Sequence, residues 1–282
     1  MQGLLGAQAT EPGQIDAATD QTAMILPASM LIGAAACGAL VGALLAMFGG
    51  GGSILATPLL IYAVGVRDPH VAIGTSAAAV ALNAAASVVG HWRGGRVKWP
   101  CAAAFAGSGL AGTVLGSSLA KQVEGHRLLL LFAFAMAAIA LSMFRRPASE
   151  GDPDVRISWP IVLRLAPAGL ATGLAAGFFG IGGGFLIVPG LMMATGMPLA
   201  SAAASSLVSV ALFGAATALN YALSGQVDWL VAVAFVAGGA AGGAAGLKGA
   251  KARAARALLA RRLFAGLILL VACYVGWRAA NG

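Results

Sequence analysis

The chain has 282 residues, of which 60% are hydrophobic and only 9% are charged, against roughly 25% charged residues in an ordinary soluble domain. Its mean hydropathy is +0.90, and a soluble domain of this size cannot bury so much apolar surface. The composition therefore excludes a soluble enzyme, a nucleic-acid-binding domain and a disulfide scaffold. The net charge of +8 does not indicate a nucleic-acid partner, because the charges are confined to a few short stretches.

The long uncharged stretches predict transmembrane helices, each of which needs about 20 apolar residues. Residues 1–25 carry three acids and no Lys or Arg, which predicts a disordered acidic tail and not a signal peptide. Ten apolar segments follow, at 26–48, 53–66, 70–92, 99–120, 127–144, 160–180, 184–197, 199–223, 229–247 and 259–278. We therefore expect an all-α polytopic membrane protein of about 8–10 helical segments.

Two of these segments, 53–66 and 184–197, are too short to cross a bilayer as ordinary helices. Each follows a cluster of glycines, at 49–52 and 180–184. Short, glycine-interrupted segments at matching places in two halves of a chain are typical of the binding site of a transporter. The pattern predicts helices that are broken near the membrane midplane, either as full crossings or as re-entrant hairpins.

The second half of the chain repeats the first. Phe48 to Pro58 matches Phe179 to Pro189 at an offset of 131, and Gly95 to Trp99 matches Gly225 to Trp229 at an offset of 130. The repeat predicts a first membrane unit at 26–144, a cytoplasmic linker at 145–159 and a second membrane unit at 160–278, with about five segments in each unit.

The positive-inside rule predicts the orientation. Six cations without an acid among them lie between two late segments: Lys248, Lys251, Arg253, Arg256, Arg261 and Arg262. If this loop is cytoplasmic, an odd number of crossings per half places the loop with Arg93 and Lys98 inside as well. The two repeats are then inverted, and both termini lie on the periplasmic side of a bacterial inner membrane.

The glycine clusters and the hydroxyls after them form the predicted binding site. Backbone N–H groups at the start of the two short helices are suited to an anion, and polar side chains on one face of the following helix suggest a cavity lining. The predicted substrate-binding residues are Gly50, Gly51, Gly52, Ser53, Thr75, Ser76, Asn83, Gly182, Gly183, Gly184, Ser205, Ser206 and Ser209. His91 is a further candidate for a proton or substrate contact.

A purely structural interpretation accompanies each of these residues. The glycines could serve close helix packing, which is the prediction for scattered ones such as Gly238 and Gly242, and the hydroxyls could bond to carbonyls of their own helix. His91 could anchor the helix end at the interface beside Trp92. No Asp or Glu lies within a predicted segment, and Asp228 and Glu124 lie at segment ends, so a carboxylate proton relay has little support. No cofactor, metal site or catalytic residue is expected.

The chain resembles the sulfite exporter TauE/SafE family over about residues 30–278. The motifs that carry the resemblance are Gly49–Ser53 with Pro58, Ala72–Ser76, His91–Trp99, and the echo Phe178–Gly184 with Pro189. The resemblance implies a transporter of small sulfur-containing anions such as sulfite, thiosulfate, sulfoacetate or taurine-derived sulfonates. The second half departs from the first, because Tyr221 stands where the first half has His91.

From the residues and the resemblance together, we expect a secondary transporter that works by alternating access, with export as the expected direction. Its partners would be the small anion, the lipid bilayer and a coupling ion, either a proton or sodium. An anion channel, a permease for another small solute or a metal ion, and an intramembrane enzyme are the alternatives. The last would need a buried nucleophile and base, for which the chain offers only His91 and scattered serines.

Overall fold

The computed structural model describes residues 12–145, 152, 155, 157–180, 184–252 and 257–281, and all of its regular elements in these ranges are helical. The elements are α1 (Pro12–Phe48), the 3-10 helix η1 (Gly49–Leu55), α2 (Ala56–Leu59), the π-helix η2 (Leu60–Val64), α3 (Pro69–Trp92), α4 (Trp99–Ala120), α5 (Gly125–Arg145), α6 (Trp159–Phe179), α7 (Gly184–Thr195), α8 (Leu199–Ala222), α9 (Trp229–Ala252) and α10 (Ala257–Asn281). Seven helical stretches in the described part are long and apolar enough to cross a membrane. The predicted all-α polytopic fold is confirmed.

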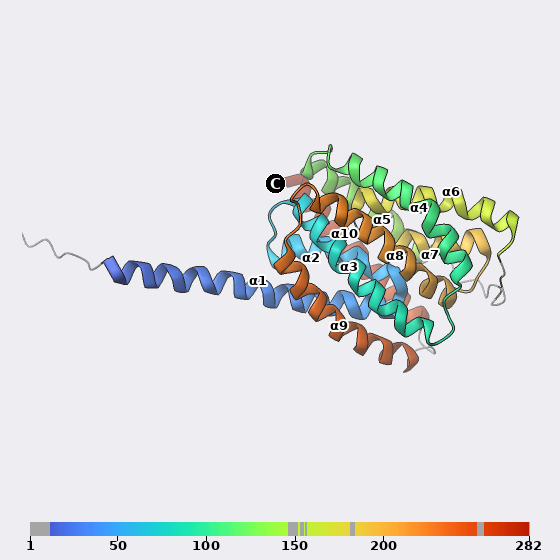
Figure 1. Cartoon of the computed structure of the whole chain (residues 1–282), viewed down its shortest axis with the longest axis horizontal. Coiled ribbons are helices and arrows are strands. Elements are labelled where there is room, and N and C mark those ends of the chain that lie inside the picture. The colour runs from blue at the N-terminus through green and yellow to red at the C-terminus, as the bar shows by residue number, and fades with distance from the viewer. Residues whose placement is uncertain are drawn as a thin grey trace, which may run out of the picture.

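The N-terminal segment differs from the expected disordered tail. Helix α1 begins at Pro12, so residues 12–25 are helical and extend away from the body of the molecule (Figure 1). Proline is well suited to the first helical position, and a helix that continues into a membrane segment avoids a separate nucleation cost. Residues 1–11 lie outside the described residues.

Proline and tryptophan mark where several helices begin. Helices α3, α4 and α6 each have proline within their first two positions, and Asp68 caps α3 by accepting a hydrogen bond from the backbone N–H of His70 at 2.8 Å. Trp99, Trp159 and Trp229 are exposed at helix starts, as expected for side chains at the level of lipid headgroups.

The chain turns back at the first glycine cluster to form a hairpin. Gly33 of α1 lies beside Ala63 of η2, and Gly52 lies against the backbone at Leu44 and Leu45. The two arms are therefore antiparallel, with the turn at Gly49, whose φ is +66°. Helices α6 and α7 also contact each other in the second repeat, where Gly190 lies beside Thr172.

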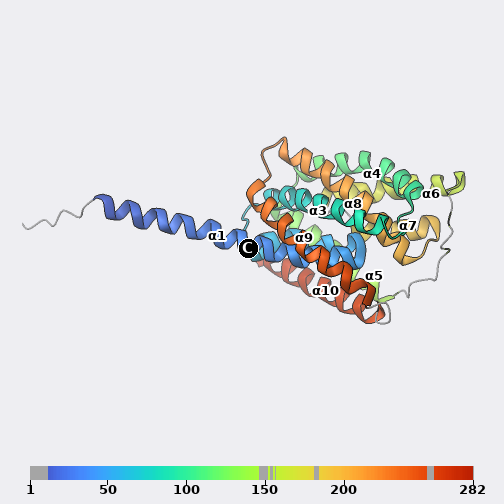
Figure 2. The ribbon, with the colours of Figure 1, turned by 60° about the horizontal axis from the view of Figure 1, so that its bottom comes forward.

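The helices form three layers, and each main pair joins the two repeats. Helix α1 packs along α9 and α4 packs along α6, with α3 and α8 paired between them (Figures 1 and 2). Under the internal repeat α1 corresponds to α6, and α4 to α9. The α5–α10 pair also joins the two repeats. The repeats therefore interlock and do not form two separate bodies.

Glycines allow the two outer pairs to approach closely. A Cβ atom on Gly38 or Gly42 of α1 would overlap the backbone of α9, and one on Gly112 or Gly116 of α4 would overlap the backbone of α6. Gly238 and Gly242 make the corresponding contact from α9 to α1. The packing role predicted for these two glycines is confirmed.

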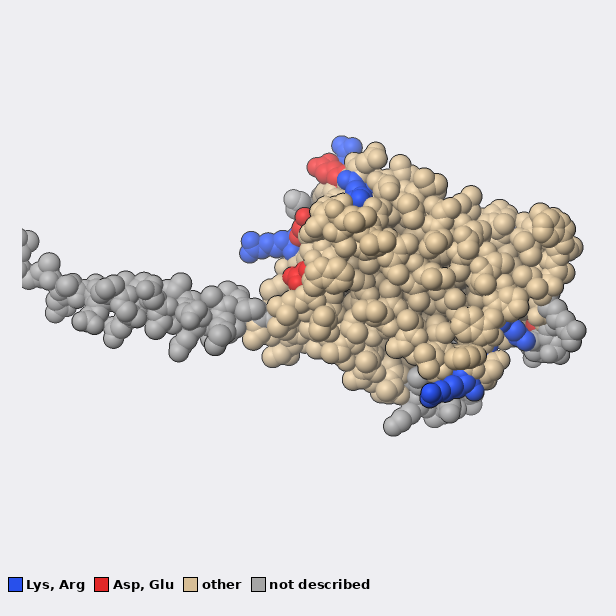
Figure 3. Space-filling view, viewed as in Figure 1, with Lys and Arg blue, Asp and Glu red and all other residues tan. Residues whose placement is uncertain are grey.

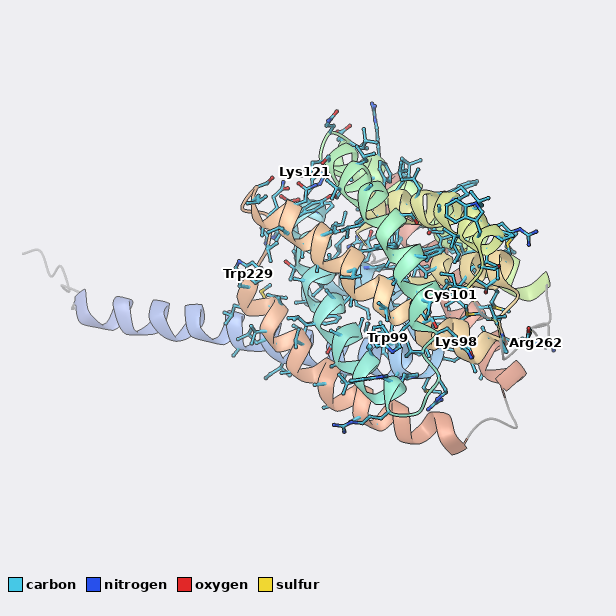
Figure 4. The ribbon with its side chains drawn as sticks, turned by 45° about the vertical axis from the view of Figure 1, so that its right-hand side comes forward. Lys98, Trp99, Cys101, Lys121, Trp229 and Arg262 are labelled. Atoms are coloured by element: carbon cyan, nitrogen blue, oxygen red, sulfur yellow. The ribbon has the colours of Figure 1, made fainter. Side chains whose placement is uncertain are left out.

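Charged side chains gather at the two ends of the helical body and leave its visible flank uncharged (Figure 3). Lys98 and Arg262 lie at one end, whereas Lys121 and Trp229 lie at the other (Figure 4). The two basic loops that were predicted to share one side therefore do share one end of the bundle. Which compartment each end faces stays a prediction, as do the inversion of the repeats and their boundaries.

Candidate functional site

The two helix breaks meet in the interior. Gly50 of η1 touches Gly184, the first residue of α7, so closely that a Cβ atom on either glycine would overlap the backbone of the other. Both residues are buried. Val210, near the middle of α8, lies against Gly50, so the contact is close to the middle of the bundle. Gly182 and Gly183, which were predicted to take part, lie outside the described residues.

At the first helix break, serine hydroxyls form hydrogen bonds with backbone groups. The N–H of Gly50 donates to Ser206 Oγ at 3.2 Å, and Ser206 Oγ donates to the carbonyl of Ala203 at 2.8 Å. Ser53 Oγ donates to the carbonyl of Gly50 at 2.8 Å. The Gly50 N–H, which the sequence suggested as a free donor for an anion, is therefore engaged in this state of the protein. Gly51 and Gly52 are buried beside it.

Thr75 and Ser205 form reciprocal hydrogen bonds between the two repeats, which we call the ties. Thr75 Oγ1 accepts from the N–H of Asp228 at 2.9 Å, and Ser205 Oγ accepts from the N–H of Lys98 at 2.9 Å. Thr75 and Ser205 are equivalent positions of the repeat, and so are Lys98 and Asp228. Each hydroxyl thus holds the loop that precedes a helix of the other repeat.

Ser76 has a local role in the first repeat. Its Oγ lies 2.8 Å from Thr57 Oγ1 and donates to the carbonyl of Ile73 at 3.0 Å. This pair of hydroxyls fastens α2 to α3.

The structure does not bring the two hydroxyl pairs together. Gly74 packs against Tyr221 at the far end of α8, so Thr75 lies near that end while Ser205 lies near the beginning of the same helix. The stretch from Ser205 to Tyr221 corresponds to roughly 24 Å of helix at 1.5 Å per residue. One small anion cannot contact both pairs at once.

Three buried polar side chains of α3 and α8 lack hydrogen-bond partners in the described structure. Both polar atoms of Asn83, Ser209 Oγ and Thr217 Oγ1 are unpaired, although Asn83 is only 3% exposed and the other two are fully buried. Nearly all buried polar groups in proteins are paired, so each of these side chains marks a position where a ligand or water completes the bonding. Asn83 and Ser209 were predicted site residues. Thr217 lies on the polar stripe that the sequence predicts for its helix, but it was not among the predicted binding residues.

Asn83 breaks the symmetry of the repeats. It lies against Gly239 of α9, while its equivalent, Phe213, lies against the equivalent glycine, Gly109 of α4. At the two equivalent contacts, an aromatic ring therefore packs against Gly109, whereas an unpaired amide packs against Gly239. A residue needed only for packing would not require the amide.

His91 lies apart from these groups, near the end of α3. It is buried, and its Nδ1 is 3.1 Å from the carbonyl of Ser87 in its own helix. Its equivalent, Tyr221, is also buried and has an unpaired hydroxyl. Within the described ranges, no three His, Cys, Asp or Glu side chains are arranged to hold a metal ion.

The fold defines a polytopic helical membrane protein. The chain belongs to the sulfite exporter TauE/SafE family, whose model matches residues 34–275. The family assignment made from the motifs is confirmed.

Curated relatives carry the same general description. A "probable membrane transporter protein" of Xylella fastidiosa strain 9a5c is 46% identical over 86% of this chain and 93% of its own length. The "probable membrane transporter protein YunE" of Bacillus subtilis is 28% identical over 71% of this chain and 81% of its own length. A protein of Methanocaldococcus jannaschii with the same description is 26% identical over 76% of this chain and 79% of its own length. No solved structure matches the chain.

Proposed function

We propose that the protein is a secondary transporter of small sulfur oxyanions, such as sulfite or an organosulfonate, and that export is its direction. The family description supports sulfite as the substrate type. The observation that carries the site is the set of buried, unpaired amide and hydroxyl side chains on α3 and α8, Asn83, Ser209 and Thr217, of which Ser209 precedes Val210 at the glycine contact. These neutral donors suit an oxyanion that must also be released.

The proposed binding site includes fewer residues than the sequence predicted. Asn83 and Ser209 form its centre, with Gly50, Gly184 and Ser206 at the break beside them. Thr75 and Ser205 act in the proposal as ties that hold the loops before α9 and α4. Release of the Gly50 N–H from Ser206 would add a backbone donor for the anion.

The helix pairs that join the two repeats limit which helices can move relative to one another. Because α1 pairs with α9 and α4 with α6, alternating access cannot separate the first half of the chain from the second. In the proposal, the α1–α9 layer and the α4–α6 layer tilt in opposite senses over the central α3–α8 pair. The two reciprocal ties at Thr75 and Ser205 would then open in turn, one at each end of the bundle.

The test is uptake of labelled sulfoacetate or sulfite by proteoliposomes that contain the purified protein. We expect saturable uptake that accelerates when unlabelled substrate is loaded on the opposite side. Flux that does not saturate and shows no such acceleration would indicate the anion channel. Thermal stabilisation by divalent metal ions and not by sulfite would indicate a metal permease.

Asn83→Leu and Ser209→Ala test the site itself. Each change should abolish or strongly reduce uptake, yet leave the unfolding temperature unchanged or higher, because an unpaired buried polar group is removed. Ser108→Ala is the matched control, since Ser108 Oγ bonds only to the carbonyl of Phe105 in its own helix. Normal uptake by both site variants would overturn the assignment.

A further inference from the structure

An open cavity with two arginines in its lining lies at one end of the bundle, away from the proposed transport site. Its volume is about 300 Å³, and four of its lining residues are Tyr62 of η2, Arg67 before α3, His126 of α5 and Arg278 of α10. Pro69, which also lines it, packs against Gly125 at the start of α5. The cavity is therefore at the end that carries Lys121, opposite Lys98 and Arg262 (Figure 4).

The two arginines of this cavity have no acidic partner in the described part of the chain, where the one ion pair joins Arg127 to Glu124 at 3.4 Å. The nearest acid in sequence, Asp68, accepts a hydrogen bond from the N–H of His70. The cavity is thus lined by two exposed arginines that form no ion pair in the described part of the chain. Guanidinium groups bind phosphate-type oxyanions through paired hydrogen bonds. An anion is therefore the class of ligand that these two arginines suit.

The fold does not require these polar residues. The positions of the second repeat equivalent to Ile61 and Tyr62 are Met192 and Met193, and neither residue that can match Arg67, Met197 or Pro198, is charged. A residue needed for the hairpin in each repeat would be expected in both halves. The basic cavity is therefore specific to one end of the molecule.

The surroundings indicate an anion with an apolar portion. Apolar side chains, including Ile61 and Leu129, line part of the cavity. The flank below it, formed by α5 and α10, exposes large apolar residues, among them Phe134 at 77% and Trp277 at 63%. Tyr62 and Tyr274 contact each other edge to face, with ring centroids 5.2 Å apart, and such aromatic residues gather at the level of lipid headgroups.

The geometry points to a binding site for an anionic phospholipid in this cavity: Arg67 and Arg278 bind the headgroup phosphate, and the acyl chains lie along the exposed flank of α5 and α10. Guanidinium groups at the end of a helical bundle are suited to the phosphate of a lipid headgroup. The same oxyanion chemistry could be supplied by free phosphate, which lacks the apolar part. The bound lipid would hold the start of α5 and the end of α10 against η2.

The experiment measures the unfolding temperature of the detergent-purified, delipidated protein with added phosphatidylglycerol, phosphatidylethanolamine or inorganic phosphate. Of these three additives, we expect only phosphatidylglycerol to raise the unfolding temperature markedly. In Arg67→Gln/Arg278→Gln this shift should be lost, whereas Arg127→Gln, whose charge lies outside the cavity lining, should retain it. Sulfite stabilisation should persist in the double variant, which separates this site from the transport site.

Three results would overturn the lipid site: an equal shift with free phosphate, an undiminished shift in the double variant, or no shift with any lipid. If the double variant fails to fold, Arg67→Lys and Arg278→Gln are tested singly by native mass spectrometry. Each should retain less phosphatidylglycerol than Arg127→Gln. Equal retention in all three proteins would also overturn the proposal.

Discussion

At the scale of single residues, the glycines that identify the internal repeat occupy backbone positions that other residues rarely adopt. All of the positive-φ glycines in the described ranges form equivalent pairs: Gly49 with Gly180, Gly65 with Gly196, and Gly95 with Gly225. Residues with a Cβ atom are strained there. The repeat is therefore visible in the sequence at the places where the chain must turn.

The contact between Gly50 and Gly184 gives a prediction at this scale. Gly184→Ala should lower the stability of the protein by about 1–3 kcal/mol, the range for an overpacked core, because the new methyl group would overlap Gly50. Thermal unfolding of the purified protein measures the effect. Gly107→Ala is the control, since a Cβ atom there has no neighbour within 4 Å, and it should be neutral or stabilising. Equal behaviour of the two variants would contradict the close contact.

At the scale of elements, the ties at Thr75 and Ser205 hold loops of one repeat against helices of the other. Thr75→Ala and Ser205→Ala should each cost about 1 kcal/mol, because each leaves a loop N–H without its acceptor. Thr75→Ser should restore stability. These two hydrogen bonds lie roughly 24 Å apart by helix length, so the cost in the double variant should be the sum of the two single costs. Strongly non-additive unfolding temperatures would contradict two independent ties.

The small-residue contacts between paired helices are a second feature at this scale. Gly112→Leu should separate α4 from α6 and reduce the amount of folded protein recovered in detergent, since the leucine side chain would occupy the space of the α6 backbone at Leu170. Recovery of monodisperse protein by size-exclusion chromatography measures this outcome. Gly266→Leu, at a position without neighbours within 4 Å, provides the comparison and should fold normally.

At the scale of the whole molecule, the inverted repeat predicts that equivalent turns face opposite compartments. Arg93 and Leu223 are equivalent positions, and both are exposed at the ends of α3 and α8. In a background with Cys37, Cys101 and Cys273 replaced by alanine, Arg93→Cys should react with a membrane-impermeant maleimide only in inside-out vesicles. Leu223→Cys should react only in spheroplasts. Labelling of both from the same side would disprove the inversion.

The sequence by itself determined the class of protein, the ten helical segments, the glycine breaks and the family, because each depends on local composition, on spacing or on a motif. It could not determine that α1 pairs with α9 and α4 with α6, since the match between small-residue faces becomes visible only when the helices are assembled. For the same reason, the tertiary structure decided the roles of the polar residues. Thr75 and Ser205 look like a single site in the sequence, but the antiparallel packing of α3 and α8 places them at opposite ends, while Asn83 and Ser209 remain unpaired.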